Sequence, residues 1–457
     1  MVELKTGTRV HFVGIGGVSM SALAELLHQR GCHISGSDRQ ASALTDRLKT
    51  LGISVKIGHA AQNIQNADVV IYTSATDPAN PERQAATKKN VPQIRRAELL
   101  GHLTESHPTI CIAGTHGKTT TTAMVGAVLE AGGLDPTLLV GGIVQGLENN
   151  LKIGNGPYWV VEADEYDRTF LALKPTVAVV TTLEADHLDC YKDIRDIRNT
   201  FEQFINLLPP NGCAILCHDE SEIRTLSFNK PFSKIMYGQS EGSQLRFDHL
   251  TPSKFSSTFT LFDNQTKMDT VTLRVPGIHN VRNALAAIGV GRFLNIDWAH
   301  IKKGIESFRG VHRRFDILGT VNNITIVDDY AHHPTEIRAT LQAARQGWPG
   351  RIVAAFQPHL YTRTRDFADD FAKELQAADQ VYLTDIYPAR EKPIPGIDGT
   401  FITNKIPHAH YAPTLDTLTN VLIQDLQPGD LLVVMGAGDI EKIPHRVWQA
   451  LQKTVKT

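Results

Sequence analysis

The segment 109–130 constrains the fold and the chemistry of this chain more than any other. An apolar, β-prone run ends at Gly114 and Gly117, and the apolar residues beyond them recur at helical spacing until a further pair of glycines. A strand, a glycine loop and a helix N-terminus in this order form an anion site, because free backbone N–H groups and the helix dipole face the same point. Lys118 can reach the terminal phosphates of a nucleotide, and Thr119 can offer a hydroxyl to a magnesium ion on them. The segment therefore predicts an ATP site.

The glycine loop is shorter than the general P-loop, which has four residues between its first glycine and the Gly-Lys pair. Only Thr115 and His116 intervene here. The alternative is a strand-to-helix turn that carries an incidental Lys-Thr pair. We favour phosphate binding because strand, loop and helix are all in register. The loop residues predicted to contact ATP are Gly114, Thr115, His116, Gly117, Lys118, Thr119 and Thr120.

Acidic residues follow two later apolar runs. The first run ends in Glu162, Asp164 and Glu165, and the run 176–183 leads into a segment that contains His187. Oxygen ligands beside a phosphate loop hold the cations that neutralise phosphate charge. The alternative, that these residues only cap the following helices, explains poorly why one strand ends in three carboxylates. We therefore predict a magnesium-dependent phosphoryl transfer.

The segment 9–38 reads as strand, glycine turn, helix and strand, which nearly matches a dinucleotide-binding fingerprint. Gly14 and Gly16 can let a diphosphate approach the backbone, and Asp38 stands where an acidic residue usually meets a ribose hydroxyl. Ser19 replaces the third glycine of the fingerprint. A tight turn of purely structural origin remains an alternative. We predict a diphosphate linked to a sugar as the ligand, with NAD only one candidate.

The apolar run 69–76 is predicted to form a further buried strand. It ends in small hydroxyl residues, among them Ser74, as the ligand-facing edge of a sheet often does. The segment 77–81 then begins a new turn and a helix.

Length and composition bound the class of protein. At 457 residues the chain is too long for one ordinary core, so two or three domains are expected. The 46 basic and 48 acidic residues nearly balance, which argues against bulk attraction to nucleic acid or membrane. No apolar run approaches the ~20 residues of a membrane span, and the N-terminus lacks the form of a signal peptide. Five scattered cysteines indicate a reducing compartment, and we expect Cys213 and Cys217 to pack in the core rather than bind zinc. These features predict a soluble, cytoplasmic α/β protein.

Two breaks divide the chain into three α/β segments. Residues 104–108 read as a linker, and residues 310–316 mark a second boundary. We predict domains at 1–107, 108–313 and 314–457. In the last domain, two strands each end in a polar loop that carries histidine or arginine.

These segments together resemble the muramyl (Mur) ligase family, over nearly the whole chain. The short glycine loop is the family's own form. The resemblance rests on Gly14-Ile-Gly-Gly17, Gly114-Thr-His-Gly-Lys-Thr-Thr120, Glu162-Ala-Asp-Glu165, Asp186-His-Leu-Asp189, His279-Asn280 with Asn283, Arg313-Arg-Phe-Asp316, Asp328-Asp-Tyr-Ala-His-His-Pro-Thr-Glu336, Phe356-Gln-Pro-His359 with Arg363-Thr-Arg365, and Gly436-Ala-Gly-Asp439. It implies an N-terminal Rossmann-like domain that grips UDP, a central P-loop ATPase domain with a mixed sheet, and a C-terminal Rossmann-like α/β domain that closes over the substrates.

The resemblance also implies roles for individual residues. Lys118, Glu162 and His187 would form the catalytic set, with Thr119, Glu162 and His187 as magnesium ligands. The residues implied to contact ATP from elsewhere in the chain are Asn283, Arg314 and Asp329. Those assigned to UDP are Gly14, Gly16, Gly17, Ser37, Asp38 and Ser74. Those implied to line the muramyl and alanine site are His332, His359 and Arg363.

The activity implied by the resemblance is the ATP- and Mg²⁺-dependent ligation of L-alanine to UDP-N-acetylmuramate, through an acyl phosphate, in peptidoglycan precursor synthesis. The chain also departs from the family pattern. Many relatives carry a basic residue directly after the histidine that matches His359, whereas this chain has Leu360. The resemblance therefore does not supply that contact to the substrate carboxylate, although Arg363 and Arg365 lie close in sequence. The carbamylated lysine of members that act later in the pathway has no match here.

Three other functions remain open on sequence alone. One is a ligase that attaches a recycled murein tripeptide to the same nucleotide sugar. An NAD-dependent oxidoreductase would use Gly14 and Asp38, but it leaves the Gly114 loop without a purpose. The third is a nucleotide-dependent binding protein without enzymatic activity. We expect only small-molecule partners, no nucleic acid, no membrane insertion, and a monomer or weak homodimer.

Overall fold

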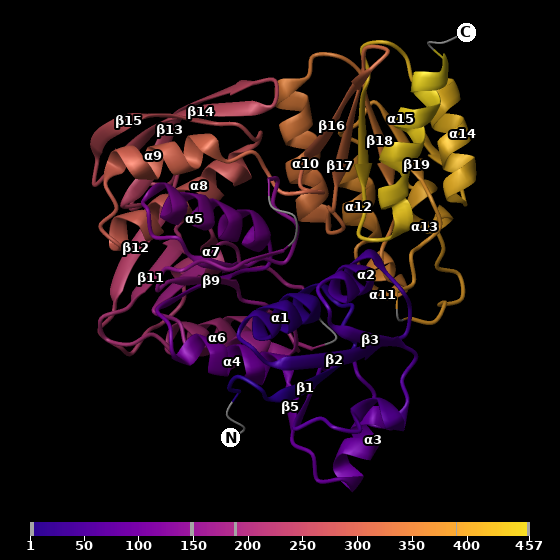
Figure 1. The fold of residues 1–457 in the computed structure, drawn as a ribbon. Coiled ribbons are helices and arrows are strands. Elements are labelled where there is room, and N and C mark those ends of the chain that lie inside the picture. The colour runs from indigo at the N-terminus through magenta and orange to yellow at the C-terminus, as the bar shows by residue number, and fades with distance from the viewer. Residues whose placement is uncertain (1–3, 147–149, 187–189, 390, 455–457) are drawn as a thin grey trace. The chain divides into compact units, whose positions relative to one another are not determined.

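The computed structural model describes residues 4–146, 150–186, 190–389 and 391–454, and three β-sheets carry its fold (Figure 1). The chain divides into two compact units. Unit 1 contains Met1–Arg246, Asp263–Gln265 and Asn283–Ile305, and unit 2 contains Phe247–Phe262, Thr266–Arg282 and Glu306–Thr457. Within the described part of the chain, none of the helices combines the length and the apolar character that crossing a membrane requires.

The first sheet, in unit 1, is parallel throughout and has the strand order β3-β2-β1-β4-β5. Its strands are β1 (Arg9–Val13), β2 (His33–Asp38), β3 (Ser54–Ile57), β4 (Val69–Tyr72) and β5 (Gln93–Arg95). Its helices are α1 (Val18–Gln29), α2 (Ala43–Thr50), η1 (Ala61–Ile64), α3 (Pro81–Lys88) and α4 (Arg96–Glu105). Because β1 lies between β2 and β4, the loops after β1 and β4 leave neighbouring strands at one edge, where such sheets bind ligands. This is the Rossmann-like arrangement that was expected.

The buried strand predicted at 69–76 is shorter in the structure. β4 ends at Tyr72, and the next residues form a turn in which the Thr76 N–H donates to the Thr73 carbonyl at 2.9 Å. The hydroxyls of Thr73 and Thr76 are 3.3 Å apart in the same turn. Hydroxyl residues compete with sheet pairing in this way, because they bond locally. Ser74 therefore lies exposed in a turn rather than at the end of a strand.

The second sheet is mixed, as expected, and has the order β15-β14-β13-β12-β11-β10-β6-β9-β7-β8. Its centre, from β12 to β7, is parallel, and β8 is antiparallel to β7. Its strands are β6 (Thr109–Ala113), β7 (Thr137–Leu139), β8 (Leu151–Lys152), β9 (Trp159–Glu162), β10 (Val177–Val180), β11 (Cys213–Cys217), β12 (Ser233–Gly238), β13 (Leu245–Ser253), β14 (Ser256–Asp263) and β15 (Thr266–Leu273). The accompanying helices are α5 (Lys118–Ala131), η2 (Tyr166–Ala172), α6 (Ile194–Ile205), α7 (Ser221–Arg224), α8 (Ile278–Phe293) and α9 (Trp298–Ser307).

Two details of this sheet agree with the sequence predictions. The helix α5 ends at Ala131, directly before Gly132 and Gly133, which were predicted to stop it. Cys213 and Cys217 are buried in β11, as predicted for core residues.

The third sheet, in unit 2, has the order β16-β17-β21-β18-β19-β20, and only β16 runs antiparallel to its neighbour. Its strands are β16 (Asp316–Val321), β17 (Ile324–Asp329), β18 (Ile352–Phe356), β19 (Gln380–Leu383), β20 (Ala409–Tyr411) and β21 (Leu431–Met435). The helices are α10 (Pro334–Gly347), α11 (Tyr361–Asp366), α12 (Ala368–Leu375), α13 (Thr400–Thr403), α14 (Leu415–Asp425), η3 (Asp439–Lys442) and α15 (Ile443–Thr454).

Alternate residues of these central strands enter two separate cores. Ala354 packs with the helices α10 and α12, whereas Val353 and Ala355 pack with α14 and α15. Side chains alternate between the two faces of a strand, so a strand covered on both faces reads as a continuous apolar run. The run at 352–356 is therefore a doubly covered central strand, and polar residues follow where it ends.

Candidate active site

The glycine loop of unit 1 follows β6 and leads into α5, as predicted. Gly114 and Gly117 have φ angles of +137° and +82°, which favour glycine. A Cβ atom on Gly117 would stand 2.7 Å from the Oδ1 atom of Asn283, so this side chain packs against the bare loop. The structure thus brings Asn283, for which the resemblance implies a contact to ATP, next to the glycine loop.

Thr181 and Thr182, which no local sequence motif marks, fix the backbone of the glycine loop at His116. The Thr182 hydroxyl accepts a hydrogen bond from the His116 N–H at 2.8 Å, and the Thr181 hydroxyl donates to the His116 carbonyl at 2.5 Å. Both follow β10, which pairs with β6. The His116 ring also lies 3.6 Å from Glu184, so the residues after β10 support one side of the loop.

Lys118 turns back toward its own loop and toward Glu165. Its Nζ donates to the Gly114 carbonyl at 2.6 Å and to the two Glu165 carboxylate oxygens at 2.9 and 2.8 Å. Burial would lower the pKa of Lys118, but the charges of Glu165, Asp164 and Glu162 outweigh it and raise the pKa. The lysine therefore stays charged and is held by a buried counter-ion.

Thr119, in the first turn of α5, contacts Glu162 at the end of β9. The Thr119 hydroxyl donates to Oε1 of Glu162 at 3.1 Å, and the backbone N–H of Gly141 donates to Oε2 at 2.6 Å. They meet because β9, which ends in Glu162, lies directly beside β6. A hydroxyl and a carboxylate at the first turn of a phosphate-loop helix are the oxygen donors that Mg²⁺ prefers.

These donors fit a magnesium–nucleotide complex. A helix N-terminus without a side-chain cap, a lysine ammonium, a hydroxyl and a carboxylate lie together, and Gly117 at the start of the helix has no side chain. His187, the third implied magnesium ligand, lies outside the described residues. Thr115 and Thr120 lie in the loop and in the first turn of α5, respectively.

The Lys118–Glu165 ion pair leads to a prediction on nucleotide affinity. Glu165→Gln removes a buried negative charge that competes with phosphate for the lysine, so we expect ADP to bind about tenfold more tightly, roughly 1.4 kcal/mol. Titration calorimetry with Mg-ADP, without other substrates, measures the change. Asp164→Asn is the matched control. It also removes one negative charge near Lys118, but Asp164 interacts with the lysine ammonium only through its charge, whereas Glu165 is hydrogen-bonded to it. Weaker ADP binding by Glu165→Gln would contradict the competition between carboxylate and phosphate.

The predicted UDP residues lie at the carboxyl edge of the first sheet. Gly14 has a φ of +81°, and its N–H donates to the Ser37 carbonyl at 2.8 Å, which ties the glycine turn to the end of β2. The Gly16 N–H donates to Oδ2 of Asp38 at 2.9 Å, so Asp38 closes this turn itself. Gly17 precedes α1 directly. The glycine turn and Asp38 therefore lie together at the carboxyl edge of the first sheet, as the fingerprint predicts.

Ser37 points into a buried polar cluster. Its hydroxyl donates to Oε2 of Glu82 at 2.5 Å, and Nδ1 of His59 lies 2.8 Å from the same hydroxyl. Glu82 also accepts from the Asn63 amide at 2.6 Å, and the His11 ring lies 3.5 Å away. The Ser37 side chain is therefore engaged inside the domain, and only its backbone meets the glycine turn.

The ionised carboxylate of Glu82 stabilises the folded state. Burial raises the pKa of this carboxyl, but the hydrogen bonds from His11, Ser37 and Asn63 outweigh burial and lower it to about 2. A lowered carboxyl pKa stabilises the fold above the unfolded value near 4.5, and the gain is lost as the pH falls from there toward 2.

We expect Glu82→Gln to destabilise the protein by about 2 kcal/mol at pH 7, and by clearly less near pH 3. Denaturant unfolding at the two pH values measures the difference. Glu105→Gln, at the exposed end of α4, serves as the control for loss of one carboxylate. An equal loss of stability at both pH values would show that the charge of Glu82 is not the stabilising element.

In unit 2, the implied nucleotide contacts Arg314 and Asp329 lie near the carboxyl end of β17. Asp329 accepts hydrogen bonds from the Phe315 N–H at 3.0 Å, the Ala331 N–H at 2.8 Å and the Thr340 hydroxyl at 3.0 Å. Burial raises its pKa, opposed by the positive charge of Arg314. Asp329 therefore fixes the shape of this loop through these three hydrogen bonds.

The structure brings two of the three implied substrate residues together. The rings of His332 and His359 have centroids 5.8 Å apart, and His359 also stacks on Tyr387 at 5.8 Å. They meet because β17 and β18 both pair with β21, so their loops leave the same edge of the sheet. Arg363 lies in the short helix α11 that follows. Leu360 has a φ of +69° and forms the N-cap of this helix.

Three features of the site depend on contacts between segments that are distant in the sequence. Gly141, Thr182 and the pairing of Glu165 with Lys118 each depend on which strands become neighbours. The signals present in the sequence were the hydroxyl residues after β10 and the third carboxylate after β9.

Family comparisons match the three segments of the chain in order. Residues 9–108 match the Mur ligase family, catalytic domain; residues 112–291 match the Mur ligase middle domain; and residues 313–438 match the Mur ligase, glutamate ligase domain.

Individual relatives match over nearly their full length. The UDP-N-acetylmuramate–L-alanine ligase of Salinibacter ruber is 44% identical over 96% of this chain and 95% of the relative, and that of Geotalea uraniireducens is 44% identical over 97% and 98%. Among solved structures, a UDP-N-acetylmuramate-alanine ligase from Thermotoga maritima has a TM-score of 0.85 at 32% identity, over 98% of this chain and 99% of that one. A murein peptide ligase from Psychrobacter arcticus has a TM-score of 0.72 at 25% identity, over 97% and 99%. The chain belongs to the Mur ligase family.

Proposed function

We propose that this chain ligates L-alanine to UDP-N-acetylmuramate in an ATP-dependent reaction of peptidoglycan precursor synthesis. The observation that carries the proposal is the meeting of Lys118, Thr119 and Glu162 at the glycine loop, in a chain whose relatives named for this activity match it end to end. The loop geometry supports the binding of a polyphosphate, and the names of the relatives indicate the other two substrates, UDP-N-acetylmuramate and L-alanine.

The reaction proceeds in two steps. The lactyl carboxylate of the sugar attacks the γ-phosphorus, the bond to the bridging oxygen breaks, and ADP leaves. The L-alanine amine then attacks the carbonyl carbon of the acyl phosphate, loses a proton, and phosphate departs as the amide forms. No side-chain nucleophile is required, so positioning and charge neutralisation carry the catalysis.

The residues divide this work among them. Lys118 would balance the charge of the terminal phosphates, and the helix N-terminus after Gly117 would hold the phosphate oxygens. Thr119 and Glu162, with His187, would hold magnesium, which supplies further positive charge where the two anions meet. We assign ATP contacts also to Asn283, and to Arg314 and Asp329 of unit 2.

The remaining assignments concern the other two substrates and the setting of the enzyme. The UDP group would bind at the Gly14–Gly17 turn with Asp38, and the muramyl and alanine groups near His332, His359 and Arg363. We propose domains at 1–107, 108–313 and 314–457. We further propose a cytoplasmic enzyme, a monomer or weak homodimer, that binds only small molecules.

A phosphate-release assay tests the proposal. UDP-N-acetylmuramate is combined with ATP, Mg²⁺ and each of L-alanine, L-serine, glycine and the murein tripeptide. We expect release to require the nucleotide sugar and to be fastest with L-alanine. Release without the sugar, or equal release with every amine, would overturn the assignment.

The second candidate is attachment of the murein tripeptide. It is favoured only by the likeness to the Psychrobacter arcticus murein peptide ligase, which is weaker than the likeness to the alanine ligases in both identity and TM-score. Faster release with the tripeptide than with L-alanine would support it. Nicotinamide dinucleotide binding, measured by calorimetry, tests the oxidoreductase alternative, and we expect none.

A further inference from the structure

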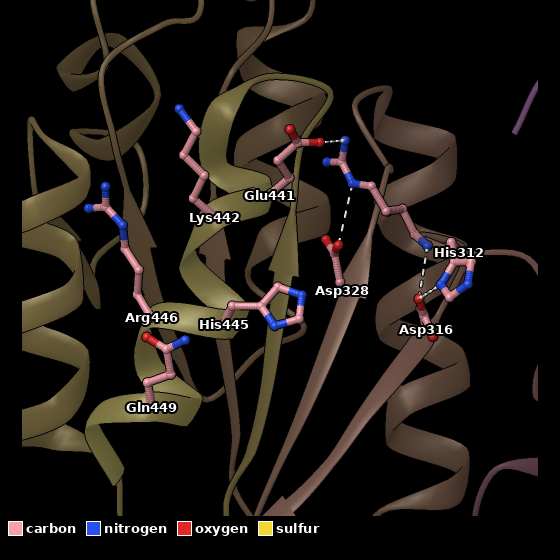
Figure 2. Close-up of a pocket in the computed structure, with 9 residues that line it drawn as sticks. His312, Asp316, Asp328, Glu441, Lys442, His445, Arg446 and Gln449 are labelled. Carbon is pink, nitrogen blue, oxygen red and sulfur yellow. Dashed lines mark hydrogen bonds and ion pairs between the residues drawn. The ribbon is translucent and has the colours of Figure 1, made fainter. Parts of the chain in front are cut away.

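Arg313 joins three separate segments of unit 2. Its guanidinium donates to Oε2 of Glu441 in η3 at 2.8 Å and to the Gly436 carbonyl after β21 at 2.6 Å. Its Nε lies 3.4 Å from Oδ2 of Asp328 in β17. Arg313, Asp328 and Glu441 line a hollow of about 500 Å³, and the two ion pairs of Arg313 to these carboxylates are drawn as dashed lines in Figure 2. One side chain therefore fixes η3, the end of β21 and the end of β17 to one another.

The backbone at Arg313 is held as tightly as its side chain. Arg313 and Phe315 have φ angles of +60° and +48°, which non-glycine residues adopt only where the surroundings impose them. The Tyr330 N–H donates to the Arg313 carbonyl at 2.7 Å, and the Arg313 N–H donates to Oδ2 of Asp316 at 3.3 Å. This bent segment carries Arg314 between its two strained neighbours.

Arg313 and the residues proposed to contact the nucleotide engage opposite sides of β17. Asp328 and Asp329 are successive strand residues, so their side chains point to opposite faces. Asp328 faces Arg313, whereas Asp329 binds Phe315 and Thr340. The two sides remain connected, because the Gly436 N–H donates to the Asp329 carbonyl at 3.1 Å while the Gly436 carbonyl accepts from Arg313.

The Tyr330 ring provides a second connection. It lies 5.0 Å from Cζ of Arg313 and 5.1 Å from Cζ of Arg314, so both guanidinium groups contact the same ring. Arg314 also lies 3.5 Å from Glu336. Displacing Arg313 would free the ring and the bent backbone that orient Arg314.

We propose that Arg313 is a positioning residue: from the far side of the sheet, it holds Arg314 and Asp329 where they contact the nucleotide. The proposal rests on the proposed function, because it takes Arg314 and Asp329 as nucleotide contacts. It adds a residue that itself touches neither the nucleotide nor the reacting atoms.

The test compares Arg313→Met and Arg313→Lys with Arg446→Met. Arg446 lines the same hollow and pairs with Asp416 at 2.6 Å, and within the described part of the chain it has no ion pair or hydrogen bond to a residue proposed to bind nucleotide. We expect Arg313→Met to raise the KM for ATP and the calorimetric Kd for Mg-ADP about tenfold, with a smaller change in kcat. Arg313→Lys should recover part of the loss, since an ammonium replaces the charge but not the forked geometry. Arg446→Met should stay within about twofold of the wild type.

A double variant separates positioning from general stabilisation. If Arg313 acts in part through Arg314, Arg313→Met combined with Arg314→Met should weaken Mg-ADP binding by clearly less than the sum of the two single losses, and what remains beyond Arg314→Met alone reflects Asp329. Additive losses, or an unchanged Mg-ADP affinity in Arg313→Met alongside a lower unfolding temperature, would overturn the proposal. Should Arg313→Met fail to fold, Arg313→Lys decides in the same way: an unchanged affinity overturns the proposal.

A wild-type chain that binds Mg-ADP but releases no phosphate with L-alanine would refute the proposed function and leave the affinity comparison valid.

Discussion

Lys118→Ala is expected to reduce phosphate release about a thousandfold. The lysine is proposed to balance the charge of the terminal phosphates together with magnesium, and its loss removes part of the positive charge that offsets the repulsion between substrate carboxylate and γ-phosphate. Because the carboxylate attacks an anion, both its approach and the developing charge depend on this cation. The measurement is the rate of phosphate release with UDP-N-acetylmuramate and L-alanine, next to Lys88→Ala at the exposed end of α3.

This variant also removes the lysine that pairs with the buried carboxylate of Glu165. We expect a circular dichroism spectrum like that of the wild type but a lower unfolding temperature, since breaking one side of a buried ion pair costs about 3–5 kcal/mol. The double variant Lys118→Ala with Glu165→Gln should regain most of the stability and none of the activity. Normal turnover by Lys118→Ala would show that the lysine does not have the role assigned to it, and recovery of activity in the double variant would place the defect in folding.

Glu162→Gln is expected to lower kcat by about a hundredfold and to raise the Mg²⁺ concentration for half-maximal rate at least about tenfold. Glutamine keeps the shape, its oxygen can accept from the Gly141 N–H, and its NH2 group can donate to the Thr119 hydroxyl, but the negative charge that would hold a divalent cation is removed. The reaction rate is measured against Mg²⁺ concentration.

Asp164→Asn is the control for Glu162→Gln, because it removes a carboxylate two residues further along without touching Thr119. We expect its Mg²⁺ requirement to stay close to that of the wild type. If both variants shifted the requirement equally, general negative charge rather than a specific ligand would explain the effect. If Glu162→Gln left it unchanged, Glu162 would not be a magnesium ligand.

Of the two neighbouring strands β6 and β9, the sequence predicts the segment that follows β6 better than the contact made at the end of β9. The strand, loop and helix from Thr109 to Ala131 follow from local rules: β-prone residues, positive-φ glycines and helical spacing. Glu162 could be named as a candidate because three carboxylates follow one strand. That it meets Thr119 depends on β9 lying beside β6, and strand order is not encoded in any local pattern.

The first sheet shows a similar division. The glycine turn and Asp38 follow from the fingerprint, and the structure brings them together. Ser37 is turned inward to Glu82, because a cluster that includes His11, from another strand, and Glu82, from α3, gives it a partner. The strand expected to reach Thr76 stops at Tyr72, because local hydroxyl bonds compete with the sheet there.

By itself, the sequence determined the class of fold, the phosphate loop, and most of the residues to test, since these depend on the order of residues within about ten positions of one another. Only the tertiary structure decided which charges pair: Lys118 with Glu165, Glu82 with its histidines, and Arg313 with Asp328 and Glu441. The physical reason is that a buried charge takes its partner from whichever strand or helix packs beside it, and that neighbour comes from a distant part of the chain.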